Sequence, residues 1–251
     1  MDLSQLPREN GFRLRGQQVT RLETFVDAAF AFALTLLVIA GDNLPDSFAE
    51  LREALRRTPV FVLCFVLIAM FWSAHNRWSR RFGLDDTPST VLSMALVLAV
   101  LVYVYPLRMV VASGLYVMSG GFVPADLVID GDNVNFDLQT AFIIYGAGFC
   151  ALSIILLLLN LHALRRGDAL GLDALERHET GTEIGIQALL TGTALLSIVS
   201  SLLLLTVFSD HRGAGVAGLP MYLYMLLGGL IPLYVNRRER RRPVLPAEAG
   251  T

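Results

Sequence analysis

The chain has 251 residues, 54% of them hydrophobic, and its formal net charge at pH 7 is −2. About 45–50% of the residues of a soluble domain are apolar even with glycine counted, so this composition excludes an ordinary soluble domain and predicts a membrane protein. The near-neutral charge gives no reason to expect nucleic acid as a partner. Cys64 and Cys150 lie in separate apolar segments and suggest neither a disulfide framework nor a metal site.

Six apolar segments are each long enough to cross the ~30 Å core of a bilayer as a helix. They cover residues 22–40, 59–78, 88–112, 140–164, 184–208 and 219–235. We therefore predict an all-α fold, a polytopic membrane protein with six transmembrane helices per chain. Residues 1–20 should form a mobile N-terminal tail, 21–236 the transmembrane domain, and 237–251 a basic, disordered C-terminal tail.

Three connections between these segments have distinct compositions. Residues 47–57 are charged and amphipathic, which predicts a short surface helix or loop. Residues 113–138 contain four aspartates, one proline and paired glycines but no basic residue, which predicts an external loop. Pro106 and Arg108 predict a kink near the end of the third helix, with the arginine reaching toward the membrane surface.

The arginines define the expected orientation. Both tails and the two connections on their side of the membrane carry 15 of the 20 arginines, against 4 in the connections on the other side. Because cytoplasmic loops are enriched in positive charge, both termini should lie in the cytoplasm, with the protein in the plasma or inner membrane.

The first helix combines an apolar stripe with an intramembrane charge. Phe25, Ala28, Ala29, Phe32, Leu36 and Ile39 share one face, with Thr35 at its margin. Asp27 lies about 140° away from Phe32 around the helix, so it should point to a different neighbour. The stripe could be ordinary helix packing. If several copies met around an axis, it could instead form a hydrophobic constriction that gates an ion path by dewetting.

Four short patterns resemble a known family. The helix begins Arg21-x-x-x-Phe25-x-Asp27 and continues into Ala33-Leu34-Thr35-Leu36, and Phe71-Trp72-Ser73-Ala74-His75 closes the second helix. Asp85-Asp86 precedes the third helix and Tyr105-Pro106 lies near its end. This order resembles the transmembrane protein 175 family, which comprises endosomal and lysosomal potassium channels and their bacterial relatives.

The resemblance implies a homotetrameric channel whose pore is lined by the first helix of each subunit, because the bacterial members assemble as tetramers. Potassium or another monovalent cation would be the permeant species, no cofactor would be needed, and the partners would be further copies of the chain and membrane lipids. The expected pore-lining residues are Phe32, Thr35, Leu36 and Ile39. Val26 replaces the serine that the family usually has, Ser93 replaces its asparagine, and Phe32 is larger than its isoleucine.

A second set of residues should hold the pore helix in place. Arg21 and Asp27 are about 120° apart on the helix and cannot readily pair with each other, so their partners should come from other helices. Trp72 and His75 are the obvious donors, and Asp85 and Asp86 should complete the cluster. The expected structural network is Arg21, Phe25, Asp27, Trp72, His75, Asp85 and Asp86.

Two other functions compete with the channel. A proton-coupled secondary transporter could use Asp27 and His75 as a relay, and helices broken at the bilayer midplane would favour it. A membrane enzyme would need a catalytic constellation, and the sequence supplies none, so we expect no enzyme activity. The remaining histidines, among them His162, show no ligand spacing and should be surface residues.

Overall fold

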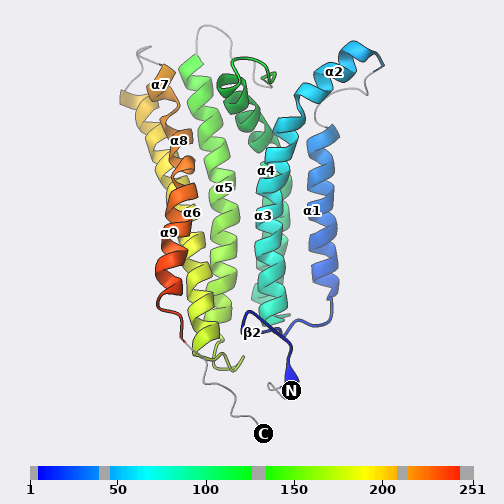
Figure 1. Cartoon of the computed structure of the whole chain (residues 1–251), viewed down its shortest axis with the longest axis vertical. Coiled ribbons are helices and arrows are strands. Elements are labelled where there is room, and N and C mark those ends of the chain that lie inside the picture. Colours follow the sequence, from blue (N-terminus) through cyan, green and yellow to red (C-terminus); the bar gives the residue numbers. More distant parts are fainter. Residues whose placement is uncertain (1–4, 40–45, 126–133, 208–213, 244–251) are drawn as a thin grey trace.

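Long apolar helices make up most of the computed structural model, which describes residues 5–39, 46–125, 134–207 and 214–243. They run side by side in one elongated bundle, and a small β-hairpin lies at one end (Figure 1). The long helices are α1 (Arg21–Ile39), α3 (Thr58–Phe82), α4 (Thr87–Met118), α5 (Val134–Arg165) and α6 (Ala174–Val207). The shorter ones are α2 (Phe48–Arg56), α7 (Ala214–Ala217), α8 (Leu219–Met225) and α9 (Leu227–Glu239).

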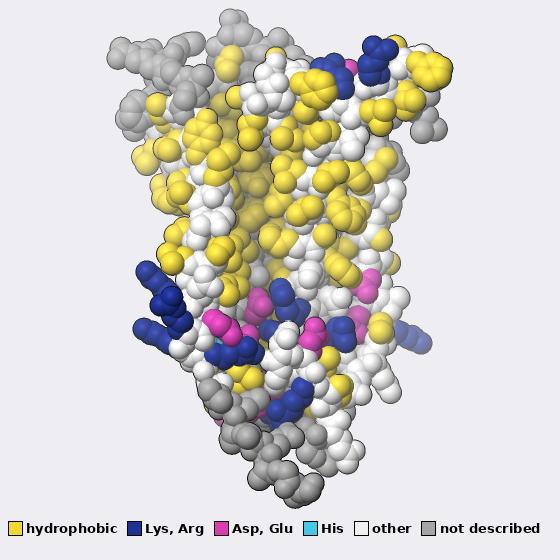
Figure 2. Space-filling view, viewed as in Figure 1, with side chains coloured by type: hydrophobic (Ala, Val, Ile, Leu, Met, Phe, Trp, Pro, Cys, Tyr) yellow, Lys and Arg dark blue, Asp and Glu magenta, His cyan; other side chains and the backbone are white. Residues whose placement is uncertain are grey.

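Five spans in the described part of the chain have the length and hydropathy needed to cross a membrane: α3, α4, α5, α6, and α8 with α9 together. The prediction of several apolar membrane helices is thus confirmed. The remaining predicted span, residues 22–40, corresponds to α1, which carries Arg21, Glu23 and Asp27 within its 19 residues. On the face shown in Figure 2, hydrophobic side chains form a broad band, and charged side chains gather below it at the end that carries the hairpin. We call this end the inner end and the opposite one the outer end.

Several helices extend beyond their predicted bounds. α4 continues to Met118, so the stretch expected to be loop from Ser113 onward begins as helix. α6 starts at Ala174, ten residues before the predicted Ile184, because a reciprocal cap supports its first turn. In this cap Asp173 accepts a bond from the Glu176 amide at 2.9 Å, and its own amide donates to the Glu176 carboxylate at 3.1 Å.

The last predicted span, 219–235, is not one continuous helix. It divides at Leu226 into α8 and α9. α9 then continues through Glu239, and Arg242 beyond it pairs with Glu179 of α6 at 3.2 Å. Residues 237–243 are therefore docked on the bundle, not disordered as predicted, and only residues 244–251 of that tail lie outside the described residues.

A β-hairpin replaces the mobile tail predicted for the N-terminus. Strands β1 (Arg8–Glu9) and β2 (Phe12–Arg13) pair in antiparallel fashion. Asn10 and Gly11 form the turn with positive φ angles of 53° and 87°, the conformation that an Asn-Gly hairpin turn favours. The Phe12 side chain is 1% exposed and packs edge-on against Phe82 at the end of α3, with ring centroids 5.6 Å apart. Burial of this aromatic ring is what seats the hairpin against the helices.

The antiparallel pair α5 and α6 forms the most extensive helix contact. Small and polar residues recur on each helix at every seventh position, the period of left-handed helix pairs. On α5 they are Gln139, Gly146, Ser153 and Asn160, and on α6 they are Thr180, Gln187, Ala194 and Ser201. The Thr191 hydroxyl donates to Ser153 at 3.1 Å, and a Cβ on Gly146 would lie 2.9 Å from the Ile198 side chain, so the backbones approach closely. We call this contact the α5–α6 seam.

Candidate functional site

One face of α1 packs into the bundle and the other does not. Val26, Phe30, Ala33 and Leu37 recur every three or four residues and are at most 4% exposed. They pack among the core residues that α3 and α4 contribute. Val26, which stands where the family usually has a serine, belongs to this face, so an apolar side chain suits its surroundings.

The opposite face of α1 is open along its whole length. The exposed residues on it are Thr24, Phe25, Ala28, Ala31, Phe32, Thr35 and Val38. Phe32 is 54% exposed and Val38 is 62% exposed. We call this row the free face of α1. A row of large apolar side chains without cover within the subunit indicates a contact with lipid or with another subunit.

The four predicted pore residues differ in how they lie relative to the free face. Phe32 and Thr35 belong to it, and the Thr35 hydroxyl donates to the Ala31 carbonyl at 3.0 Å, which leaves its oxygen able to accept. Leu36 is only partly exposed and packs against the core. The side chain of Ile39 lies outside the described residues. Val38, which was not predicted, is the most exposed large apolar side chain of the helix.

Asp27 is tied to α3 by a tryptophan. The Trp72 indole, one of the two donors that the sequence offers, donates to the Asp27 carboxylate at 2.7 Å. His75, one turn further along α3, is 3% exposed and bonds Ser93 of α4 at 3.0 Å instead of Asp27. Two short polar links therefore connect α1 to α3 and α3 to α4. Ser93 is the position at which the family commonly has an asparagine.

Glu23 is a network residue that the sequence analysis missed. Its carboxylate accepts from the Ser79 hydroxyl of α3 and, at 2.8 Å, from the amide of Thr20, whose own hydroxyl accepts from the Glu23 amide at 3.1 Å. This is a capping box, and the pattern Thr-x-x-Glu before an apolar run is its sequence signature. Glu23 therefore both starts α1 and fastens its first turn to α3.

The two aspartates before α4 do not join the Asp27 cluster, which corrects the prediction. Asp86 caps α4 by accepting from the Ser89 amide at 3.1 Å and reaches across to α5, where it meets His162 at 2.8 Å and Arg166 at 3.0 Å. Burial acts to raise the pKa of Asp86, but its hydrogen bonds to Ser89 and His162 outweigh burial and lower the pKa to about 2. His162 is thus a partner of Asp86 and not an unengaged surface residue. Asp85 is exposed.

The remaining members of the predicted network are peripheral. Arg21, the first residue of α1, is exposed and makes no ion pair within the described part of the chain. Phe25 is 50% exposed on the free face. Neither belongs to the buried face that packs α1 against α3 and α4.

A strap formed by residues 8–16 fixes the segment that leads into α1. The Glu176 side chain is fully buried at the start of α6. It accepts from Arg13 through Nη2 at 2.7 Å and from Arg15 through Nη2 at 2.9 Å. The hydrogen bond to Glu176 raises the pKa of Arg13 above its ordinary value. At the other end of the strap the Gly16 amide donates to the Arg80 carbonyl at 3.0 Å.

Gly16 and Gly83 allow the strap to lie directly on the end of α3. A Cβ on Gly16 would lie 2.5 Å from the Ser79 carbonyl oxygen. Gly83 ends α3 with a positive φ of 55°, and a Cβ there would lie 2.9 Å from the Gly16 amide nitrogen. Both positions therefore require glycine, one for space and the other for space and backbone conformation.

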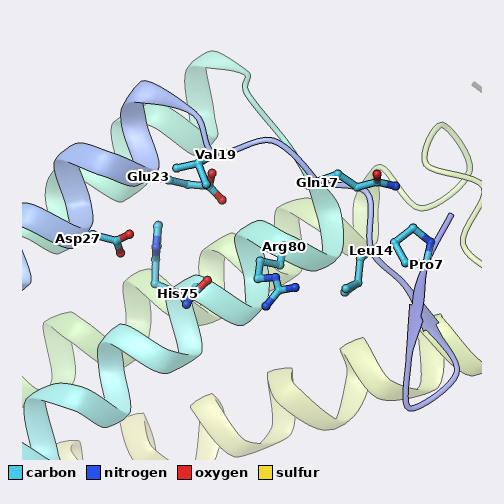
Figure 3. A pocket seen from close by; sticks show the side chains of 10 residues that line it. Pro7, Leu14, Gln17, Val19, Glu23, Asp27, His75 and Arg80 are labelled. Carbon is cyan, nitrogen blue, oxygen red and sulfur yellow. The ribbon is translucent and has the colours of Figure 1, made fainter.

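A polar cavity of about 530 Å³ lies between the strap, α1 and α3. Figure 3 shows Glu23 and Asp27 entering it from α1, with His75 and Arg80 entering from α3. The polar links that hold α1 thus line a space at the inner end of the helix. Among the described residues no group of three or more His, Cys, Asp or Glu side chains is arranged to hold a metal ion.

Comparisons with known proteins bear on this arrangement. The family model "Endosomal/lysosomal potassium channel TMEM175" matches residues 21–106. A protein named "Potassium channel" from Marivirga tractuosa is 30% identical over 232 residues, which cover 92% of this chain and 93% of that protein. The crystal structure of a variant of the potassium channel MtTMEM175, in complex with a nanobody fusion protein, matches with a TM-score of 0.77 and 28% identity. That match covers 94% of this chain and 100% of the other.

Proposed function

The chain belongs to the TMEM175 family of potassium channels, and from this premise we propose that its copies assemble around a pore lined by the free face of α1. It is a membrane channel protein and not an enzyme. The single observation that carries the proposal is that face. Phe25, Phe32 and Val38 are each at least 50% exposed, although the opposite side of the same helix is fully packed.

The charge pattern of α1 supports the proposal that its free face meets other subunits and not lipid. Its apolar part, residues 28–39, would extend for only about 18 Å at a rise of ~1.5 Å per residue, well short of the ~30 Å bilayer core. Glu23 and Asp27 lie in the first two turns and are hydrogen-bonded to α3. A helix with this pattern can act as the sixth span when its free face meets other subunits and water.

Four copies would place four Phe32 rings near one level of the axis and four Thr35 side chains about one turn away. We infer that Phe32 and its neighbours form a hydrophobic constriction, which gates an ion path by excluding water when it is narrow. Thr35 oxygens can accept and would replace part of the hydration shell of a monovalent cation. Potassium is the permeant ion that the family implies.

The orientation follows from the charges of the inner end. Figure 2 shows arginine and acidic side chains gathered at this end below the apolar band. Because cytoplasmic segments carry the excess of arginine, the strap and the end of α9 would face the cytoplasm of a cell whose plasma or inner membrane holds the channel.

A proton-coupled transporter is not favoured. Such transporters place their sites at broken helices near the bilayer midplane. Asp27 and His75 lie instead on the continuous helices α1 and α3. α4 is also continuous through Pro106.

The proposal can be tested by measuring potassium flux into proteoliposomes for two variants, each of which replaces one exposed phenylalanine by alanine. Phe32→Ala should raise the resting flux several-fold because it removes the largest side chains from the constriction. The control is Phe65→Ala on α3, whose ring is 42% exposed on a different helix and should leave the flux near that of the wild type. Equal flux in the two variants, or a particle that is not a tetramer by mass measurement, would contradict the proposal.

A further inference from the structure

The α5–α6 seam lies apart from α1 and buries an unusual row of polar groups. On α6, Gln187, Thr191, Ser197 and Ser201 are all 9% exposed or less. From Thr180 to Ser201 the row extends for about 31 Å at ~1.5 Å per residue, so it crosses the full depth of a bilayer core. No part of this row faces the free face of α1, where the proposed pore lies.

Among the described residues, side-chain hydrogen bonds join α5 to α6 only at the middle of the seam. The Thr191 hydroxyl donates to Ser153, which in turn donates to the Phe149 carbonyl at 2.9 Å. Polar residues that join membrane helices in this way need no further explanation. The other polar side chains of the row make no hydrogen bond between α5 and α6 among the described residues.

Four fully buried side-chain oxygens along the seam have no protein hydrogen-bond partner among the described residues. They are Gln139 Oε1, Gln187 Oε1, Ser197 Oγ and Ser201 Oγ. The Tyr224 hydroxyl of α8 is in the same state. It lies beside the Ser197 hydroxyl of α6, and it also approaches Gly146 of α5. Ser197, Ser201 and Tyr224 therefore form one group of hydroxyls, while Gln187 lies about 15 Å further toward the inner end at ~1.5 Å per residue.

Buried polar groups in native proteins bond either to protein or to ordered water, and buried water molecules typically make about three hydrogen bonds. The hydroxyl group offers three polar partners, two on α6 and one on α8. Inside a bilayer the requirement is stricter because no solvent reaches these atoms from the lipid.

We propose that the α5–α6 seam of each subunit binds ordered water molecules, one among Ser197, Ser201 and Tyr224 and another at Gln187. The site belongs to each protomer and is separate from the ion path. Its ligand is water because the lining offers uncharged donors and acceptors with no counter-charge for an ion.

The sign of a stability change tests the proposal. If the seam were dry, Ser197→Ala, Ser201→Ala and Gln187→Leu would each remove an unsatisfied polar group and raise the melting temperature of the assembled protein in lipid nanodiscs. If water bridges these groups, each variant loses hydrogen bonds and the melting temperature falls, by about 2–4 °C. Ser153→Ala is the control, because its hydroxyl bonds to protein and its loss should lower the melting temperature in either case.

A map of the wild-type assembly at a resolution that shows ordered water gives an independent test. Density at both positions, with melting temperatures that fall, supports the proposal. Absence of density at either position, in a map that shows water elsewhere, overturns it. A rise in melting temperature for two of the three variants overturns it as well.

Discussion

Replacement of the buried Glu176 should cause a large loss of stability. Its carboxylate is fully buried and accepts from Arg13 N at 2.9 Å, from Arg13 Nε at 3.0 Å and Nη2 at 2.7 Å, and from Arg15 Nη1 at 3.1 Å and Nη2 at 2.9 Å. Glu176→Gln keeps the size of the side chain but removes the charge that both guanidinium groups share; Arg15 loses its acidic partner, and Arg13 keeps only Asp173, at 3.2 Å. Removing one partner of a buried ion pair costs about 3–5 kcal/mol. We expect the lower end, near 3 kcal/mol, because the amide oxygen can still accept.

Thermal unfolding of the purified protein measures this loss. For a chain of this size about 1 kcal/mol corresponds to roughly 2–4 °C, so the melting temperature should fall by about 6–12 °C. The matched control is Glu179→Gln on the same helix. Its partner Arg242 lies 3.2 Å away in a more exposed ion pair, worth at most about 1 kcal/mol. The reasoning is refuted if Glu176→Gln lowers the melting temperature no more than Glu179→Gln does.

Three further predictions concern the links between helices. Asp27→Ala should reduce the yield of assembled oligomer in size-exclusion chromatography more than Asp27→Asn, because asparagine still accepts from Trp72; equal losses would contradict this role. Asp86→Asn should keep the cap of α4 but lose the ion pairs to α5. Since the folded pKa of Asp86 is about 2 against an ordinary 3.8, those pairs stabilise the protein above pH ~4 and are lost toward pH ~2. The difference in melting temperature between wild type and this variant should therefore narrow on acidification, and a constant difference would refute it. Gly16→Ala should detach the strap, which limited proteolysis near residue 16 would detect, whereas Gly114→Ala, with open space around it and no positive φ, should not.

The periodic spacing of apolar residues was enough to predict which residues share one face of a helix. The spacing of Phe25, Phe32 and Thr35 placed them on one face of α1, and the structure leaves that face open. An intramembrane carboxylate needs a partner, which led to Trp72 and His75 as donors for Asp27; Trp72 donates to it, whereas His75 bonds Ser93. Both inferences concern a single helix, or two helices that are neighbours along the chain.

Contacts between distant segments were beyond this reasoning. Arg13 and Glu176 are 163 residues apart, and neither looks unusual within its own polar stretch. Asp86 was assigned to the wrong cluster because its position along the membrane normal does not say which neighbouring helix it faces. Two local signals were nevertheless available: Asn10-Gly11 is a typical hairpin turn, and Thr20-x-x-Glu23 is a helix cap.

The strap has a consequence for the order in which the protein is made. Translation proceeds from the N-terminus, so α1 leaves the ribosome long before Glu176 has been synthesised. During that interval the arginines of the strap have no acid to bind, and the helix next to them is fixed only by α3 and α4. Final seating of the first helix must therefore wait until the start of α6 emerges, and a chain truncated before that point would lack the anchor of its own beginning.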